Sequence, residues 1–435
     1  MRPQLCRYPK PVTGWLICCC AAALVSADAS AQDGSKVPPK FETGAVLRVR
    51  GETRSGIGEN AAREDGFGLS RLQLNLTVRP SKQVKFVVQG QDSRVFGLAP
   101  GRSTTPFRNP ADLREGYVAL GREDGPLTLV VGRRILEFGK ARLLGGRDWS
   151  NTSPGWDGST MTLRRGLDSV TLLAVTQVDT LEGLDRPSRT RFLYGAHGLI
   201  ASWKKGHRIE PFFLTSRRPV DMASNLGGLL RTVGSDFNGV LLGSWDYSVL
   251  LAAQGGSIDT GPHRAWQGVW EVGKTLESAP AKPRFAIEWS YASGDDDPTD
   301  GKRGTYDTLH PSVHGIFGIQ DFVSHRNIKI LKTSVDLHPR RNLSLSVDFL
   351  DLRLASLRDG LYQLNGRRRI APPEGGASSG FVGSELDFLV RYRPAPRIEF
   401  SLGASRFFAG EFVTRNVEGG ESQTFLHGAL TVEFF

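Results

Sequence analysis

The residues with the most evident chemistry lie in the segment 130–158, which reads VVGRRILEFGKARLLGGRDWSNTSPGWDG. It places the cations Arg133, Arg134, Lys140, Arg142 and Arg147 beside Asp148, Trp149, Asn151, Trp156 and Asp157. A guanidinium group suits the planar geometry of a carboxylate, and cations stack on indole rings, as sugar rings also do. The segment therefore suits a saccharide that carries carboxylates.

Other arginines recur at alternate positions of extended stretches. They are Arg48, Arg50 and Arg54, then Arg71 and Arg79, and finally Arg391 and Arg393, mixed with Glu52, Gln89, Gln91, Asp92, Glu385 and Asp387. Alternate side chains of a strand share one face, so this set predicts a charged wall. In a pore such a wall concentrates anions, while the carboxylates hold the guanidinium groups and keep binding weak. Alternatively, ladders of opposite charge simply brace the wall.

The elements that would position these residues are β-strands. In 71–79 every even position is aliphatic and every odd position is polar, and 285–291, 385–393 and 397–405 repeat this alternation. Gly-, Pro- and Asp-rich segments at 79–82, 122–126, 338–342 and 392–396 predict tight turns, whereas 293–304 and 365–380 predict longer loops at the opposite rim. The pattern predicts an all-β fold, a transmembrane antiparallel up-and-down β-barrel.

The beginning of the chain predicts export. Residues 1–31 combine a basic start, an apolar stretch at 14–25 and the small residues Ala29, Ser30 and Ala31, which is typical of a signal peptide cleaved after about Ala31. All four cysteines lie in this segment. The barrel would then occupy 32–435 and end on the aromatic residues Phe434 and Phe435, which suits recognition by the barrel-assembly machinery. A soluble β-sandwich explains the alternation equally well, but not the export signal together with the aromatic end.

The length of the chain sets the size of the barrel. At roughly 22 residues per strand and connection, the expected number of strands is about 18, with 16 as the alternative. A barrel with a plug domain would need a much longer chain, so no plug domain is expected.

The segment 130–158 resembles a motif of the alginate-export family of outer-membrane porins, in which a Gly-Arg or Gly-Gln strand end leads through yG..RllG..dWsn to fDg. Three further stretches resemble the same family. They are VVQGQDSRVFG with LREGYVAL, then YASGDDDPTDGKRGTYDTLHPSVHGIFGIQDF, and finally VGSELDFLVRYRP with LGASRFFAGEFV. The resemblance implies a monomeric barrel of 18 strands in the bacterial outer membrane, with an arginine-rich constriction and passive export of a polyuronate.

Carried over by motif, the expected pore residues are Asp92, Arg94, Arg133, Arg142, Arg147, Asp148 and Arg391, with His310, His314 and Asp321 from the loop TLHPSVHGIFGIQD. Alternation and composition add Arg48, Arg50, Arg71, Arg134, Trp149 and Arg393 to this set. After the fG of this motif the family usually has an aromatic or acidic residue, whereas this chain has Lys140 after Phe138 and Gly139. Because the family also includes members unconnected with alginate, the resemblance fixes the architecture more firmly than the cargo.

The sequence thus predicts an anion-selective channel that passes alginate-like polyuronate or other anionic solutes by passive diffusion. The net charge of +10 and the predominance of arginine agree with an anionic partner. Expected partners are an anionic oligo- or polysaccharide, outer-membrane lipid and the assembly machinery, with no nucleic acid and no cofactor.

Other functions remain as alternatives. One is a porin of the same fold for another small solute, such as an aromatic compound, and another is an outer-membrane hydrolase or receptor. No P-loop, GxSxG elbow or dinucleotide fingerprint indicates an enzyme. Asp295, Asp297 and Asp300 offer carboxylates for Ca²⁺, but a solvated rim loop explains them as well, so no metal is expected.

Overall fold

The computed structural model describes residues 40–55, 65–98, 106–153, 155–181, 184–218, 228–258, 261–312, 314–418, 420 and 422–435. The expected signal peptide at 1–31 and the first residues expected for the barrel, 32–39, lie outside the described residues. The strands are β1 (Lys40–Ser55), β2 (Asp65–Ser81), β3 (Val84–Phe96), β4 (Asn109–Leu120), β5 (Leu127–Arg134), β6 (Trp156–Arg165), β7 (Asp168–Asp179), β8 (Arg186–Leu199), β9 (His207–Arg218), β10 (Gly228–Val240), β11 (Trp245–Ile258), β12 (Gly261–Thr275), β13 (Arg284–Ala292), β14 (Ile328–Arg340), β15 (Leu343–Leu354), β16 (Leu361–Tyr362), β17 (Arg368–Ile370), β18 (Phe381–Ala395), β19 (Ile398–Ala409) and β20 (Gln423–Phe434). The helices are η3 (Leu242–Ser244) and α2 (Glu411–Asn416).

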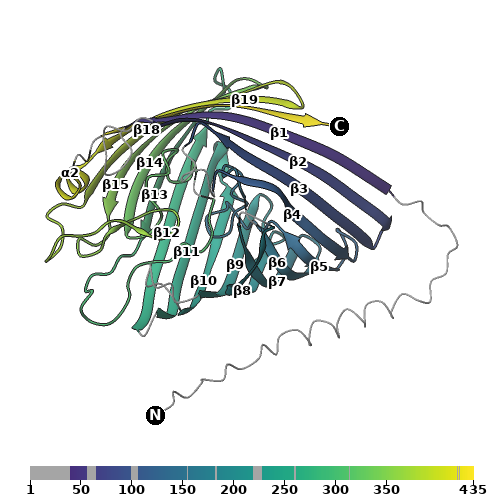
Figure 1. The fold of residues 1–435 in the computed structure, drawn as a ribbon, viewed down its shortest axis with the longest axis horizontal. Coiled ribbons are helices and arrows are strands. Elements are labelled where there is room, and N and C mark those ends of the chain that lie inside the picture. Colours follow the sequence, from purple (N-terminus) through teal and green to yellow (C-terminus); the bar gives the residue numbers. More distant parts are fainter. Residues whose placement is uncertain are drawn as a thin grey trace, which may run out of the picture. The chain divides into compact units, whose positions relative to one another are not determined.

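All strands except β16 and β17 form one sheet of 18 strands, which closes on itself. Neighbours along the chain pair antiparallel, and β1 pairs with both β2 and β20, so that Ala45 lies opposite Leu74 on one side and opposite Phe434 on the other. Closure leaves no strand edge unpaired, which is a requirement for a sheet surrounded by lipid. The predicted antiparallel barrel of about 18 strands is therefore confirmed (Figure 1).

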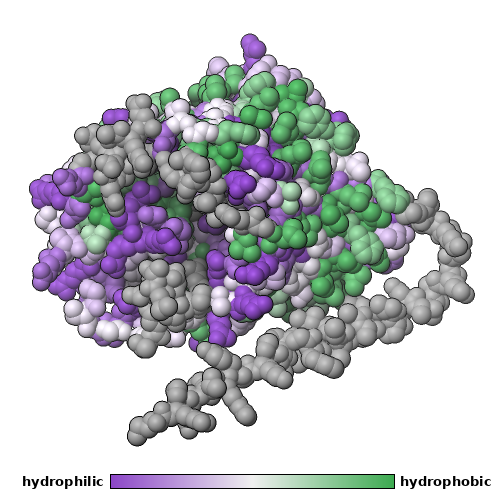
Figure 2. Space-filling model, in the orientation of Figure 1, coloured by the Kyte–Doolittle hydropathy of each residue, from purple (hydrophilic) through white to green (hydrophobic). Residues whose placement is uncertain are grey.

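The two faces of the barrel wall have opposite character. In β2, Arg71 and Gln73 are buried on the inside, whereas Leu72 and Leu74 are 37% and 56% exposed on the outside. Figure 2 shows hydrophobic residues gathered over the part of the surface where β1 and β19 run, and hydrophilic residues toward the loops near α2. A soluble sandwich would expose its polar face, so this pattern is that of a wall in contact with hydrocarbon.

Short turns and long loops lie at opposite rims. At one rim, β2 and β3 are separated by residues 82–83, and β14 and β15 by residues 341–342. At the other rim, long connections occupy 135–155, 293–327 and 355–380, the last of which contains the β16–β17 hairpin. The predicted loops 293–304 and 365–380 lie within the long connections, and the predicted turn 122–126 lies between β4 and β5. The predicted turns 79–82, 338–342 and 392–396 begin earlier than the observed ones, because β2, β14 and β18 continue to Ser81, Arg340 and Ala395. Outer-membrane barrels place short turns toward the periplasm and long loops toward the cell exterior.

Helical structure is minor in the described residues. α2 is a single short helix that follows β19, and its Phe412 and Val413 are buried. None of the helices in the described part of the chain has the length and apolar character needed to span a membrane.

Candidate functional site in the bore

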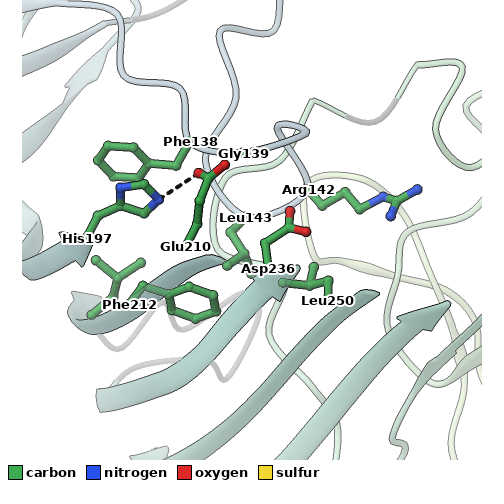
Figure 3. A pocket seen from close by; sticks show the side chains of 10 residues that line it. Phe138, Gly139, Arg142, Leu143, His197, Glu210, Phe212, Asp236 and Leu250 are labelled. Atoms are coloured by element: carbon green, nitrogen blue, oxygen red, sulfur yellow. Dashed lines mark ion pairs between the residues drawn. The ribbon is translucent and has the colours of Figure 1, made fainter. Parts of the chain in front are cut away.

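The connection between β5 and β6, which we call the first inner loop (135–155), crosses the inside of the wall. Phe138 stacks on His197 of β8, with ring centres 4.1 Å apart, and His197 Nε2 lies 3.1 Å from Glu210 Oε2 of β9 (Figure 3). Gly139 follows with a positive φ of 54°, and a Cβ atom there would lie 2.8 Å from a carboxylate oxygen of Asp236. Only glycine allows both the left-handed backbone and this close approach.

Hydrophobic contacts hold this loop against the wall. Leu136, Leu143 and Leu144 of the loop are buried together with inward-facing residues of β7, β8, β9 and β11, namely Leu173, Val175, Leu193, Phe212, Leu214 and Leu250. Burying each leucine contributes about 1.5–3 kcal/mol. The apolar part of the barrel interior is therefore covered by protein rather than open to a solute.

A second inner loop, the connection 293–327 between β13 and β14, meets the first inside the barrel. His310 N donates to Leu143 O at 3.0 Å, and Gly145 N donates to His310 O at 3.0 Å. Ser312 N donates in turn to Ala141 O at 2.9 Å. The two loops thus pair like short parallel strands across the bore.

The opposite side of the bore presents arginines to the first inner loop. Arg48 Nη1 donates to Asp148 O at 2.7 Å, and Arg50 Nη1 donates to Trp149 O at 2.7 Å. Arg71 donates to both Asp148 O and Asp148 Oδ1, at 2.8 and 2.7 Å. The three arginines are only 8%, 3% and 4% exposed. Backbone carbonyls satisfy many of their N–H groups but carry no net charge. Arg50 Nη2 also lies 2.8 Å from Glu52 Oε1, so Glu52 and Asp148 balance only part of the positive charge of the three arginines.

The Asp148 carboxylate stands between these guanidinium groups, and its side chain is 72% exposed to the water of the bore. The surrounding wall acts to raise the pKa of Asp148 by desolvation, but the charges of Arg71 and Arg48 outweigh that effect and lower this pKa. Asp148 is therefore ionised at neutral pH.

Trp149 joins both loops to the wall. The His314 ring of the second inner loop stacks on the Trp149 indole at 3.6 Å and is parallel within 1°. The Arg50 guanidinium carbon also lies 3.6 Å from the Trp149 ring centre, so the two partners must cover opposite faces of the indole. His314 Nδ1 lies 3.1 Å from Asp321 Oδ2. The stack therefore links the two inner loops to each other and to Arg50 of the wall.

A charged cavity of about 240 Å³ adjoins the two loops. Arg142 pairs with Glu288 of β13, and Lys140 Nζ lies 3.0 Å from Glu271 Oε2 of β12. The cavity is lined by four cations and four carboxylates: Lys140, Arg142, Arg284 and Lys332 with Glu271, Glu288, Asp336 and Asp348. Since the opposite charges balance, this cavity has no evident preference for anions or cations.

Two inward carboxylates of β18 anchor the second inner loop. Gln320 N donates to Glu385 Oε1 at 2.9 Å, and Ile319 N donates to Asp387 Oδ2 at 3.1 Å. Glu385 and Asp387, which were expected to balance arginines of the bore, thus hold the second inner loop in place, away from Arg48, Arg50 and Arg71, which we call the arginine wall.

Most of the expected pore residues lie inside the barrel. The structure brings together Arg48, Arg50, Arg71, Asp148, Trp149, His314 and Asp321, with Arg142, Arg147 and His310 nearby in the paired loops. Arg134 reaches the inward Thr160 of β6. Arg391 shares the inward face of β18 with Glu385 and Asp387, but Arg393 pairs with Glu399 near the short-turn rim, away from the loops.

Asp92 and Arg94 do not belong to this set, contrary to the expectation from the family motif. Asp92 lies opposite the exposed Leu72, and both share the outward face of the wall with Phe96, which is 60% exposed. Arg94 Nε donates to Asp92 Oδ1 at 2.6 Å on this same face. The inward positions of β3 belong instead to Gln91 and Ser93, which are buried.

Arg133 also differs from expectation. It pairs with Asp157 of β6, with Nε and Oδ1 2.8 Å apart, and its Nη1 lies 3.9 Å from Asp112 of β4. Its Nη2 donates to the carbonyl of Asp185 in the β7–β8 loop at 3.1 Å. Arg133 therefore braces the wall and a rim loop, and it does not join the guanidinium groups around Asp148.

The carboxylates around Arg133 predict a pH-dependent stability. Desolvation and the nearby Asp112 raise the pKa of Asp185 to about 6. A raised carboxyl pKa contributes stability that is complete below the unfolded value near 3.8 and is lost as pH rises through 6. Asp185→Asn should therefore stabilise the protein by about 1 kcal/mol at pH 8 and leave it unchanged at pH 4.

Thermal unfolding in detergent at both pH values measures this effect. Asp157→Asn is the matched control, because it removes a carboxylate that pairs directly with Arg133, and it should destabilise the protein at pH 8. If both substitutions changed the unfolding temperature at pH 8 by the same amount and in the same direction, the raised pKa of Asp185 would be contradicted.

The candidate calcium ligands do not converge. Asp297 accepts hydrogen bonds from Thr299, and Asp300 accepts from Lys302, each within its own turn. Asp295 is buried, and its backbone N–H donates to Asp359. Throughout the described ranges, no three His, Cys, Asp or Glu side chains gather closely enough to hold a metal ion.

Sequence reasoning missed Arg114, which lies close to the arginine wall. Its Nη1 donates to Gln89 Oε1 at 2.6 Å, and its charge acts on Asp148. The register of β4 shifts between Leu113 and Glu115, so simple alternation along this strand gives the wrong face for Arg114. The sequence indicates Asn151 only as one polar residue of the segment 130–158, yet its Nδ2 donates to the carbonyls of Ser70, Arg94 and Phe107.

Comparison with known proteins defines the class. The model of the alginate export family matches residues 40–426. The chain therefore belongs to the alginate export family, and it is an outer-membrane channel of the bacterial cell rather than an enzyme. No curated protein sequence matches it.

Solved structures share the fold. Pseudomonas aeruginosa OpdK has a TM-score of 0.61 and 11% identity over 91% of this chain and 98% of its own. OccK11 (OpdR) of the same organism has a TM-score of 0.59 and 12% identity, and the match covers 91% of this chain and 96% of its own. Acinetobacter baumannii OccAB1 has a TM-score of 0.57 and 12% identity, and the match covers 91% of this chain and 97% of its own. At these identities the likeness concerns the barrel architecture alone.

Proposed function

We propose that this channel is anion-selective and passes alginate-like polyuronate or other anionic solutes by passive diffusion. The observation that supports the proposal is the excess of cations where the first inner loop meets the wall. Arg48, Arg50, Arg54, Arg71 and Arg114 gather there, and the four carboxylates whose charges act on them are Glu52, Glu115, Asp148 and Asp321. The remaining positive charge in a narrow, partly desolvated passage attracts anions and repels cations.

The contacts of Asp148 suggest how an anion would pass. Its carboxylate occupies the position between Arg71 and Arg48 that a uronate carboxylate would take. If residues 146–150 move aside, the arginines that donate to them become available to the solute. Exchanging one carboxylate for another preserves the charge-assisted hydrogen bonds, so the exchange costs little free energy.

The competing proposal of an apolar or aromatic solute has less support. It would need an open apolar surface, and the leucines of the first inner loop cover the apolar wall.

Planar-bilayer recordings test the proposal. In a KCl gradient the reversal potential should indicate chloride preference, and oligouronates should block the current at concentrations about tenfold below those of neutral oligosaccharides of equal length. A cation preference would refute anion selectivity. Equal block by neutral and acidic oligosaccharides would refute the polyuronate as cargo while leaving ion selectivity intact.

A further inference from the structure

Three arginines face outward at the long-loop rim of β9, β10 and β12. Arg217, Arg231 and Arg264 are all exposed and lie within three residues of the ends of their strands at that rim. The same outward face carries Val233 and Trp266, which are 54% and 44% exposed. These arginines therefore sit at the upper border of the apolar band that contacts lipid, in the leaflet toward the cell exterior.

The sheet register brings these arginines together. Arg231 lies opposite Gly255 of β11, and Gly255 lies opposite Arg264, so one row across three strands reads arginine, glycine, arginine. Arg217 pairs with Leu229, two residues before Arg231 on the same face. With strands about 4.8 Å apart, the Arg231 and Arg264 backbones are separated by about 10 Å, a distance that two arginine side chains can close around one anion.

The space between the arginines is open. A Cβ atom added to Gly255 would meet nothing within 4 Å, so no side chain fills the gap between Arg231 and Arg264. Below it, Trp266 stacks on Tyr291 with ring centres 4.4 Å apart, and Trp270 stacks on Trp289 at 4.9 Å. Trp266 lies two residues from Arg264 along β12, where aromatic side chains meet lipid head groups, whereas Trp270 lies about 20 Å from Arg264, at the depth of the acyl chains.

Two other outward arginines at this rim have carboxylate partners on their own strand, whereas Arg406 of β19 donates to Thr424 Oγ1 of β20 at 2.6 Å. Arg94 pairs with Asp92, and Arg353 pairs with Asp351, both with Nε–Oδ1 distances of 2.6 Å. Among the described residues, no acceptor contacts the side chains of Arg217, Arg231 or Arg264. A cation facing lipid without a partner is unfavourable unless the membrane supplies a counter-ion.

We propose that Arg217, Arg231 and Arg264 bind the phosphate group of a phosphorylated glycolipid in the outer leaflet. Guanidinium groups form short, charge-assisted hydrogen bonds with phosphate oxygens. The stacked aromatic residues below receive the apolar part of the same lipid. This site lies on the outside of the wall and is independent of solute passage through the bore.

Native mass spectrometry of the detergent-solubilised protein with diphosphoryl lipid A tests the site. The double variant Arg231→Gln with Arg264→Gln should weaken binding about tenfold or more. The matched control, Arg94→Gln with Arg353→Gln, removes the same charge from the same face and rim and should change binding less than twofold. Heat-modifiable mobility on gels verifies that both variants form barrels.

Two further binding measurements identify the ligand. Dephosphorylated lipid A should bind the wild-type protein as weakly as diphosphoryl lipid A binds the double variant, and inorganic phosphate should not displace the lipid at equal concentration. Equal loss of binding in both double variants, or full binding of the dephosphorylated lipid, would overturn the proposal. Binding of inorganic phosphate with the affinity of the lipid would assign the site to a soluble phosphate instead.

Discussion

Replacing Arg48, Arg50 and Arg71 together with glutamine should abolish the anion preference of the channel. The three side chains surround Asp148 with more positive charge than Asp148 and Glu52 balance, and glutamine keeps hydrogen-bond donors of moderate size while removing that charge. The ratio of chloride to potassium permeability should fall about tenfold, since the field at a desolvated constriction decides which ion enters. Reversal potentials in a KCl gradient measure the ratio.

The control for this experiment removes the same charge from the short-turn rim. Arg122, Arg341 and Arg397 are exposed in turns, and their replacement by glutamine should leave the permeability ratio within about twofold, because surface charges are screened by salt over about 10 Å. Equal effects of the two triple variants would show that net charge, and not the arginine wall, sets selectivity.

The fold could be predicted from the sequence because alternation is a local property of each strand. In β2 the even positions are aliphatic and the odd positions are polar, so the sequence alone indicates which side chains face hydrocarbon and which face the bore. The same local logic places Arg48, Arg50 and Arg71 on one wall, and the structure agrees. The number of strands followed from length together with the family resemblance, as no single strand encodes it.

The arrangement of the bore could not be predicted in the same way. Asp92 and Arg94 were assigned to the bore by motif, although each shares strand parity with the outward Phe96. Arg114 was overlooked because a register shift in β4 interrupts the alternation. The two errors have different causes. For Asp92 and Arg94 the motif outweighed the alternation of β3, whereas for Arg114 the register shift of β4 hides the face of the side chain.

The inward path of the loops was equally hidden in the sequence. The contacts of Arg50 with Trp149, and of Trp149 with His314, join residues about a hundred or more positions apart. Such contacts depend on loops whose composition resembles that of solvated rim loops. Only the leucines within the segment 135–144 distinguish the first inner loop, since a fully solvated loop has no need of buried apolar side chains.

Shortening the first inner loop should enlarge the current and strengthen the anion preference at once. Replacing residues 146–150 by two glycines keeps Leu143 and Leu144 packed against the wall but removes the carbonyls and the Asp148 carboxylate that cover Arg48 and Arg71. Conductance should rise about twofold or more, because a barrel of 18 strands is wide enough for an aqueous channel once the loops withdraw. Single-channel recordings measure both quantities, and removal of the exposed rim segment 296–302 serves as the control that should change neither. A larger current with reduced anion preference would show that Asp148 and its neighbours, rather than the arginines beneath them, select the ion.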